Sequence, residues 1–287
     1  MIKIERQNLD DIAIEYLTKL ESMGRYKAGY QVRTHYIDNI KRLVLAKPNE
    51  FKDIKGEFDK KFKQPGAEGF GDFKDYMENQ YKTMRDKYGY WLLKTLNIKV
   101  CPYCNRQYTF TIEKEKKKVK VSPELDHFYS KSTYPFLALS FYNLVPSCSV
   151  CNHTKGVEGI NIHPYFQGFY DHCKFKIKTK DNEEFSLDWA LKNKLEIDFT
   201  DTNSNIDVFA LKELYNEHID YVQEIISKAQ AYNHSYYSSL IDSYRGLGKQ
   251  EEEIDRFIWG NYLEIAEHEK RPLSKLTKDI LQQLDIK

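Results

Sequence analysis

Four of the five cysteines occur as two Cys-x-x-Cys pairs that lie far apart in the sequence. The pairs are Cys101–Cys104 and Cys148–Cys151. Each pair places two thiolates on one tight turn, and two such turns complete the tetrahedron that zinc prefers. A single pair of this kind could also be a redox dithiol, but two pairs favour a structural zinc site. The fifth cysteine, Cys173, is expected to be a small buried hydrophobic residue.

The segment between and after these pairs contains residue types that could carry out hydrolytic chemistry. Asp126 and His127 are adjacent, and Asn143 follows 17 residues after the aspartate. Asn152 directly follows the second cysteine pair, and Lys155 comes one helical turn later. An acid beside a histidine is weak evidence alone, because a lone histidine is more often structural than catalytic. The complete set in this order is far more specific.

This set resembles the HNH endonuclease family, whose catalytic part is two antiparallel strands and a helix, the ββα-metal fold. The likeness covers roughly residues 101–156. It implies that Asp126 and His127 end the first strand, that Asn143 opens the second, and that Asn152 lies on a helix beginning at the second cysteine pair. The fold class predicted is therefore α+β, mostly helical, with an HNH module and its four-cysteine zinc site inserted between N- and C-terminal helical regions.

The resemblance also implies a role for each residue. His127 would be the general base that takes a proton from water, since a neutral imidazole suits that task near pH 7. Asp126 and Asn152 would bind one catalytic divalent cation through oxygen, which suits Mg²⁺ or Mn²⁺. That cation would clamp the scissile phosphate. Asn143 would orient the imidazole or its loop, and Lys155 could contact phosphate or the transition state.

Three neighbouring features leave alternatives open. His153 follows Asn152, and some HNH proteins use histidine at the third motif position, so His153 could replace or assist the asparagine as the metal ligand. Residues 130–141 (SKSTYPFLALSF) stand where many family members have a glycine-containing loop. We expect this stretch to be loop and packing segment that shapes substrate access. His163 could bind a substrate phosphate, although packing of its Pro-Tyr-Phe neighbours at the end of the module is favoured.

A longer string resembles one subgroup of the family, the PtuB-like nucleases of bacterial Septu antiphage systems, which also occur beside some retrons. The string is CPYCNRQYTF, LDHFY and YPFLALSFYNLVPSCSVCNHTKG, and RPLSKLTKDI near the C-terminus fits it. The resemblance implies a nucleic-acid substrate, DNA by default with structured RNA or transfer RNA as an alternative. It also implies a PtuA-like ABC/SMC-type ATPase partner, and a reverse transcriptase with its RNA and DNA in a retron setting.

The sequence itself contains no G-x-x-x-x-G-K-[ST] loop, so P-loop ATP hydrolysis would fall to that partner. Two other functions stay open. One is a standalone HNH restriction or homing nuclease, and the lack of a recognisable sequence-reading module argues mildly against it. The other is a non-catalytic zinc-binding adaptor.

Charge is unevenly distributed along the 287 residues, whose net charge is only +1. Residues 96–180 carry 13 Lys and Arg against 6 Asp and Glu. A basic middle suits a module that faces nucleic acid, but a solvated lysine-rich hairpin explains it equally well. We find no run of 18 apolar residues and no signal-peptide core at the N-terminus. These features predict a cytoplasmic protein that does not enter a membrane.

Periodicity divides the chain into three expected regions. Residues 1–97 form an N-terminal helical region, with a loop at 63–72 that is rich in glycine. Residues 98–180 contain the HNH module, a hairpin over 107–121 and strand character at 174–179. Residues 181–287 form a C-terminal helical region with helices expected at 208–226, 250–269 and 272–284. Most of these helices are expected to serve as core and scaffold.

Overall fold

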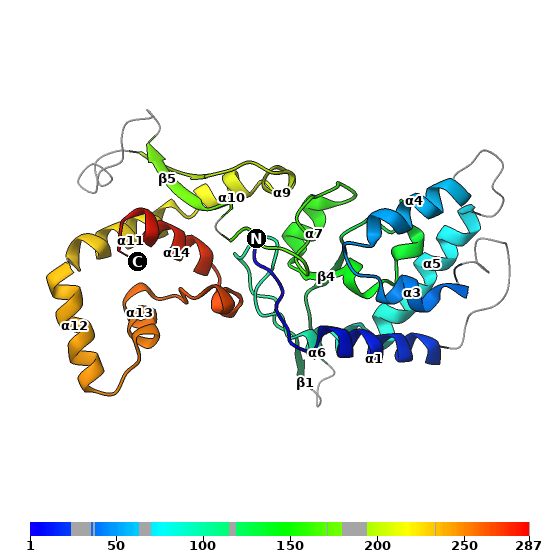
Figure 1. Cartoon of the computed structure of the whole chain (residues 1–287), viewed down its shortest axis with the longest axis horizontal. Helices are drawn as coiled ribbons and strands as arrows, with labels where there is room; N and C mark the ends of the chain where they lie inside the picture. The colour runs from blue at the N-terminus through cyan, green and yellow to red at the C-terminus, as the bar shows by residue number, and fades with distance from the viewer. Residues whose placement is uncertain are drawn as a thin grey trace. The chain divides into compact units, whose positions relative to one another are not determined.

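The computed structural model describes residues 1–23, 36, 38–62, 70–114, 119–170, 172–179, 194–232 and 234–286. Helices dominate these ranges, and three two-stranded antiparallel sheets accompany them (Figure 1). The predicted class, α+β and mostly helical, is confirmed. Within the same ranges, no helix combines the length and the apolar character that crossing a membrane requires.

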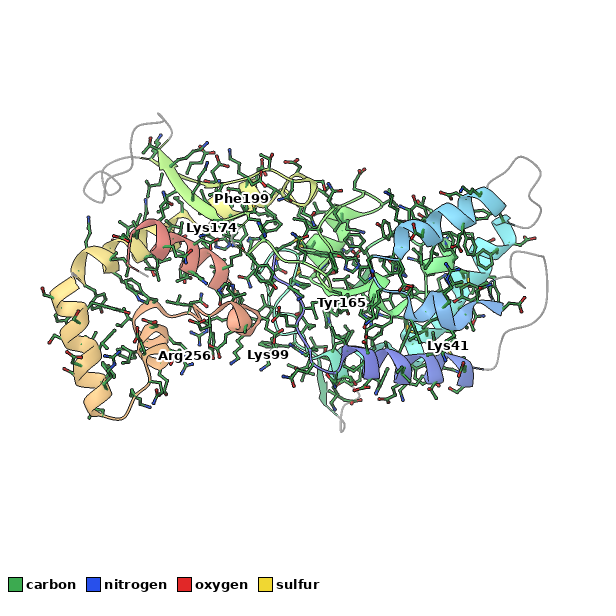
Figure 2. The ribbon with its side chains drawn as sticks, in the orientation of Figure 1. Lys41, Lys99, Tyr165, Lys174, Phe199 and Arg256 are labelled. Carbon is green, nitrogen blue, oxygen red and sulfur yellow. The ribbon has the colours of Figure 1, made fainter. Side chains whose placement is uncertain are left out.

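The chain divides by its contacts into two compact units, each assembled from separate stretches of sequence. Unit 1 contains Met1–Lys3, Lys99–Tyr108 and Gln167–Lys287, and unit 2 contains Ile4–Ile98 and Thr109–Phe166. In Figure 2, Phe199 is a side chain of unit 1 and Tyr165 is one of unit 2. The sequence analysis divided the chain into three continuous regions, whereas these two units are discontinuous in sequence. The division into three regions stays a prediction.

Unit 2 begins with helices that are amphipathic in sequence. They are α1 (Leu9–Ser22), α3 (Ile40–Leu45), α4 (Phe51–Phe62), α5 (Phe70–Met84), the π-helical turn η1 (Arg85–Gly89) and α6 (Tyr90–Leu96). Helix α1 buries one apolar face and packs against α3 and α6. Helix α5 starts at Phe70, two residues before the predicted end of the loop. The rest of that loop, 63–69, lies outside the described residues.

The strands of unit 2 form two hairpins, and a short helix follows the second. These elements are β1 (Ile112–Lys114), β2 (Val119–Val121), β3 (Glu124–His127), η3 (Pro135–Leu137), η4 (Phe141–Asn143), β4 (Leu144–Ser147) and α7 (Ser149–Lys155). Strands β1 and β2 confirm the hairpin expected within 107–121, whose tip at 115–118 lies outside the described residues. Helix α5 packs against η3, and α7 packs against β3.

Unit 1 is built on a third hairpin covered by helices. Its elements are β5 (Phe175–Thr179), β6 (Leu195–Phe199), α9 (Ser204–Val208), α10 (Leu211–Asn216), α11 (Ile219–Ala231), α12 (His234–Gly246), α13 (Glu251–Trp259), η5 (Ile265–Lys270) and α14 (Ser274–Gln283). Burial alternates along β5 and β6, so one face of the hairpin is apolar. Helix α14 packs on β5, and α10 packs on β6.

Two of the helices expected in this unit are interrupted. The stretch 208–226 contains the end of α9, all of α10 and part of α11. The first break falls at Ala210, which takes a left-handed conformation with φ 47°, and the second falls at Glu217 and His218. Helix α13 ends where Gly260 takes φ 73°, a conformation that glycine adopts without strain, so the expected helix over 250–269 was wrong beyond Trp259. The apolar stripe continued across these breaks and hid them from a periodicity argument.

Candidate active site and cysteine cluster

Strands β3 and β4 form the framework of the candidate site. They pair antiparallel with Asp126 opposite Val145 and His127 opposite Leu144. The chain then turns into α7, where the Sγ atom of Cys148 at the N-cap accepts a hydrogen bond of 3.4 Å from the Cys151 amide. Asp126 and His127 lie at the end of β3 and Asn152 lies on α7, whereas Asn143, expected to open the second strand, ends η4 one residue before β4 begins.

Asp126 is almost fully buried and is paired with a buried lysine. The ammonium of Lys155 lies 3.2 Å from one carboxylate oxygen and 3.3 Å from the other. It also donates a 2.7 Å hydrogen bond to the backbone carbonyl of His127. The Lys155 side chain is 0% exposed, so its charge neutralises Asp126 and fixes the end of β3. The contact with phosphate considered from the sequence has no support in this placement.

The imidazole of His127 is held in one tautomer by its surroundings. Its Nε2 lies 3.0 Å from the carbonyl oxygen of Ala138, and a carbonyl can only accept, so Nε2 carries the hydrogen. The lone pair is therefore on Nδ1, which has no hydrogen-bond partner among the described residues. Burial lowers the pKa of His127 from 6.5 to about 3, and the Lys131 ammonium adds to that effect. The ring is therefore neutral near pH 7.

Asn143 braces the loop that follows β3. Its Oδ1 accepts a 2.8 Å hydrogen bond from the Tyr129 amide, and its Nδ2 donates to the carbonyls of Tyr129 and Leu137 at 3.0 Å each. Its own carbonyl accepts from the Phe128 amide at 2.9 Å. The side chain is fully buried. Its side-chain hydrogen bonds are to the loop rather than to the imidazole, so of the two alternatives from the sequence the geometry favours the loop.

Asn152 and His153 occupy different surroundings on α7. Asn152 lines a cavity of about 320 Å³ together with Asp126 and His127. His153 is exposed, and its Nδ1 lies 2.7 Å from the carbonyl of Ser149, one turn earlier in the same helix. His153 is absent from the described residues that line the cavity. The structure therefore brings Asn152, and not His153, to the side of Asp126.

The donor atoms at this cavity suit a hard divalent cation. A carboxylate and an amide oxygen are ligands that Mg²⁺ and Mn²⁺ prefer over zinc, and Asp126 and Asn152 both face the same open space. Buried Lys155 supplies a counter-charge beside this carboxylate. The residues therefore fit the cation that the motif implies.

Sequence reasoning missed two residues of this cavity. Tyr81, on α5, packs its ring edge against the His127 imidazole at a centroid distance of 4.4 Å, and its hydroxyl donates a 3.1 Å hydrogen bond to the Leu125 carbonyl. Lys131 lines the cavity and lies 5.2 Å from the centre of the Tyr81 ring. Nothing in the local pattern of α5 separates Tyr81 from the other aromatic residues of a scaffold helix.

The four paired cysteines come together as predicted. Their sulfur atoms all lie within 4.8 Å of one another, all four residues are buried, and none forms a disulfide. Four sulfurs bound to zinc at about 2.3 Å would lie roughly 3.8 Å apart, so the cluster has the size of a tetrahedral zinc site. Backbone amides support it, since the Arg106 amide donates to the Sγ atom of Cys104 at 3.4 Å, as the Cys151 amide does to Cys148.

The first cysteine pair is anchored through the residue that follows it. Asn105 is fully buried and takes a left-handed conformation with φ 51°. Its side chain donates to the His268 carbonyl at 3.0 Å and accepts from the Lys275 amide at 3.1 Å. Its carbonyl accepts from the Leu273 amide at 2.7 Å. The RPLSKLTKDI segment thus fixes the backbone next to Cys104.

Two further sequence expectations concern residues outside this cavity. His163 is buried among aromatic rings, with the Phe128 ring centre 4.0 Å from its own, which fits the packing alternative and not contact with phosphate. Burial lowers the pKa of His163 to about 3. Cys173 is 2% exposed, as expected for a small buried residue.

The comparisons with known proteins found one informative relative. The chain is similar to the Septu protein PtuB of Bacillus thuringiensis, with 29% identity over 151 residues. The match covers 50% of this chain and 51% of PtuB, so the chain matches about half the length of that relative. No protein-family model matches the chain, and no solved structure matches it. The chain is thus related to PtuB-like proteins.

Proposed function

We propose that this chain is a metal-dependent endonuclease of the HNH type that hydrolyses phosphodiester bonds of nucleic acid, with DNA as its first substrate. The observation that carries the proposal is one cavity of about 320 Å³ lined by Asp126, His127 and Asn152. A neutral base and two oxygen donors thus face one space. A bound Mg²⁺ or Mn²⁺ would neutralise charge on the phosphate there.

The residues around the cavity divide the work. Nδ1 of His127 accepts a proton from the attacking water, because the Ala138 carbonyl holds the hydrogen on Nε2. Asp126 and Asn152 would hold the cation. Asn143 positions the loop that contains Ala138, whose carbonyl contacts His127, through its hydrogen bonds to Tyr129 and Leu137.

A biological setting follows from the relationship to PtuB. We propose that the chain is the nuclease component of a Septu-type antiphage system and that it works with a PtuA-like ABC/SMC-type ATPase. A retron reverse transcriptase with its RNA and DNA is the alternative setting. The four-cysteine cluster is proposed to hold structural zinc, which would fix the start of α7 and so the position of Asn152.

The proposal is tested by comparing the wild-type chain with His127→Ala. Purified protein, alone and with its ATPase partner, is incubated with plasmid DNA and with total RNA in Mg²⁺ or Mn²⁺. Loss of the general base is expected to lower the cleavage rate by about 10²–10⁴-fold. The matched control is His153→Ala, which removes a neighbouring exposed imidazole and should retain cleavage.

Three outcomes decide between the functions. Cleavage that His127→Ala abolishes supports the nuclease, and the substrate that is cut identifies the nucleic acid. Equal cleavage by wild type and His127→Ala contradicts the assigned mechanism. If folded, zinc-loaded protein cuts nothing in any condition, with or without the ATPase, the chain is instead a zinc-binding adaptor.

A further inference from the structure

We propose that the segment Ser130–Ser132 forms the phosphate-binding wall of the cavity, with Lys131 as its charged contact to the backbone of the nucleic acid. This inference rests on the proposed nuclease function and assigns a substrate contact that the motif does not contain. All three residues line the same cavity as Asp126 and His127. The space that holds the base and the oxygen donors therefore also has a wall of hydroxyls and an ammonium.

The charge of Lys131 is not neutralised by an ion pair with any residue that the structure describes, although Glu78 and Glu124 also line the cavity. The Lys131 ammonium lies 5.2 Å from the centre of the Tyr81 ring, an arrangement in which the ring quadrupole attracts the cation. Tyr81 in turn contacts His127, so one ring positions both the lysine and the base. An anionic ligand in the cavity would supply the missing partner for Lys131.

The two serines leave one hydroxyl hydrogen for a ligand. Their Oγ atoms lie 2.7 Å apart, and one hydroxyl donates to the other. Two hydroxyls hold two hydrogens and this bond uses one, so the second hydrogen is available to an acceptor such as a phosphate oxygen. The Ser132 amide is directed to Ser130 Oγ at 3.3 Å, which keeps the pair together.

The wall is held rigidly, as a binding surface requires. The Ser130 carbonyl accepts from the amides of Thr133 at 3.1 Å and Tyr134 at 2.8 Å, which closes a tight turn. One residue earlier, Asn143 clamps both backbone groups of Tyr129. A preorganised turn loses little conformational entropy when it binds phosphate.

Lys55 provides a matched control for Lys131. Its ammonium lies 4.2 Å from the Tyr129 ring centre and 4.4 Å from that of Tyr134. It therefore has the same charge and the same kind of aromatic contact as Lys131. Lys55 is not among the described residues that line the cavity, so its removal should not affect a phosphate bound there.

The test measures binding separately from cleavage. The zinc-loaded His127→Ala chain is titrated, in buffer without Mg²⁺ or Mn²⁺, onto a fluorescein-labelled DNA duplex over a salt series, and anisotropy reports the dissociation constant. Adding Lys131→Gln should weaken binding by about 5–10-fold. The plot of the logarithm of the binding constant against the logarithm of the salt concentration should become less steep by about 0.9, the value for one lost phosphate contact. Lys131→Arg should restore most of the affinity, and Lys55→Gln should leave both quantities unchanged.

The outcomes separate this inference from the proposed function. Equal effects of Lys131→Gln and Lys55→Gln, or no binding by the His127→Ala chain, overturn the phosphate-binding wall. Thermal unfolding of each variant shows whether a loss of binding comes from a loss of fold, and a well-folded Lys131→Gln protein that binds normally also overturns it. If the wild-type protein does not cleave but Lys131→Gln specifically weakens DNA binding, the proposed nuclease function is wrong and the proposed phosphate contact stands.

Discussion

Among the residues that the structure describes, each unit contains one buried lysine–aspartate pair, and the two pairs are built alike. In unit 2, Lys155 and Asp126 lie 3.2 Å apart, with side chains 0% and 4% exposed. In unit 1, Lys275 and Asp279 lie 2.7 Å apart, with side chains 4% and 3% exposed. Each lysine also donates to a backbone carbonyl. Distance, burial and charge therefore do not distinguish the two pairs.

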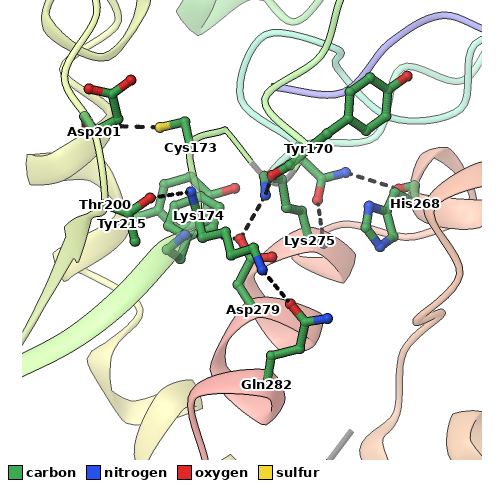
Figure 3. Close-up of polar contacts among 12 residues, drawn as sticks. Tyr170, Cys173, Lys174, Thr200, Asp201, Tyr215, His268, Lys275, Asp279 and Gln282 are labelled. Atoms are coloured by element: carbon green, nitrogen blue, oxygen red, sulfur yellow. Dashed lines mark hydrogen bonds and ion pairs between the residues drawn. The ribbon is translucent and has the colours of Figure 1, made fainter.

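The surroundings distinguish them. Asp279 accepts a 2.9 Å hydrogen bond from the Phe175 amide, and Lys275 donates to the Tyr170 carbonyl at 2.9 Å (Figure 3). These bonds join α14 to the start of β5. Burial raises the pKa of Asp279 above its usual value, although Lys275 opposes the shift. The unit 1 pair thus satisfies protein groups and holds two elements together.

The carboxylate of unit 2 has access to open space. Asp126 lines the cavity that His127 and Asn152 share. A buried ion pair is weak evidence for either stability or function by itself, and the comparison shows what decides between them. A carboxylate that lines a cavity beside a neutral base can act on a ligand, whereas one that holds a strand to a helix stabilises the fold.

The largest expected effect separates the two aspartates by activity. Asp126→Asn and Asp279→Asn each remove one negative charge and keep the size of the side chain. Asp126→Asn should lower the cleavage rate per folded molecule by at least about 100-fold, because a cation ligand and its charge are lost. Asp279→Asn should change that rate by less than about threefold. Initial rates on plasmid DNA, normalised to the folded fraction from circular dichroism, measure both.

Similar losses of specific activity in the two variants would contradict the distinction between a catalytic Asp126 and a structural Asp279. An active Asp126→Asn protein would remove Asp126 from the chemistry, and an inactive but folded Asp279→Asn protein would give the unit 1 pair a catalytic role.

The next effect concerns stability and uses the lysines. Lys155→Met and Lys275→Met each leave a buried carboxylate without its counter-charge, which costs about 3–5 kcal/mol of unfolding free energy. In Lys155→Met a divalent cation can supply the missing charge, because Asp126 lines the cavity. Mg²⁺ should therefore raise the unfolding temperature of Lys155→Met more than that of wild type, and should not do so for Lys275→Met.

Calorimetric scans at several Mg²⁺ concentrations, with Ca²⁺-free buffer and an EDTA reference, provide the measurement. If Mg²⁺ shifts the unfolding temperatures of the two variants equally, Asp126 is no more accessible to a cation than Asp279 is.

Much of the site follows from the sequence because it depends on local spacing. Asp126 and His127 share the end of one strand, and Asn152 follows Cys151 on the helix that Cys148 caps. The cysteine pairs could be assigned from spacing because a structural zinc site takes four protein ligands, and the sulfurs do come together. Such features need only the order of residues within short segments.

Other features of the site and of the fold depend on packing between segments that are distant in sequence, and they leave no periodic signal in the sequence. Tyr81 reaches His127 from a helix that precedes it by more than 40 residues. The burial of Lys155, which turns a possible phosphate contact into an internal counter-charge, depends on how α7 packs on β3. The end of α13 at Gly260 was equally hidden, because glycine is tolerated within helices as well as after them.

A smaller effect tests whether the network of the unit 1 pair also supports the cysteines. Asn105 links the Lys275 amide to the backbone beside Cys104. Asn105→Ala removes buried hydrogen bonds and places alanine at φ 51°, which together should cost about 1–3 kcal/mol. Zinc should then leave the protein at a lower chelator concentration, measured with a colorimetric zinc indicator. Asn105→Gly, which relieves the backbone strain, should recover part of the loss, and unchanged zinc retention would limit the network to the fold.

The smallest effect compares one buried histidine from each unit. Burial lowers the pKa of His163, in unit 2, to about 3 and that of His268, in unit 1, to about 4. Each titrates near 6.5 in the unfolded chain, so between these values the unfolded state binds the extra proton. The unfolding free energy should therefore fall as the pH drops below 6.5, by up to about 1.4 kcal/mol per pH unit for each histidine.

His163→Phe keeps a ring in the aromatic cluster and removes the titrating group, so its urea-unfolding free energy should depend less steeply on pH than that of wild type between pH 6 and 4.5. His268→Gln should reduce the slope by a similar amount. Between pH 7 and 8 both histidines are neutral in either state, so variants and wild type should run parallel there. A wild-type slope that His163→Phe leaves intact would mean that the cluster opens to water before the protein unfolds.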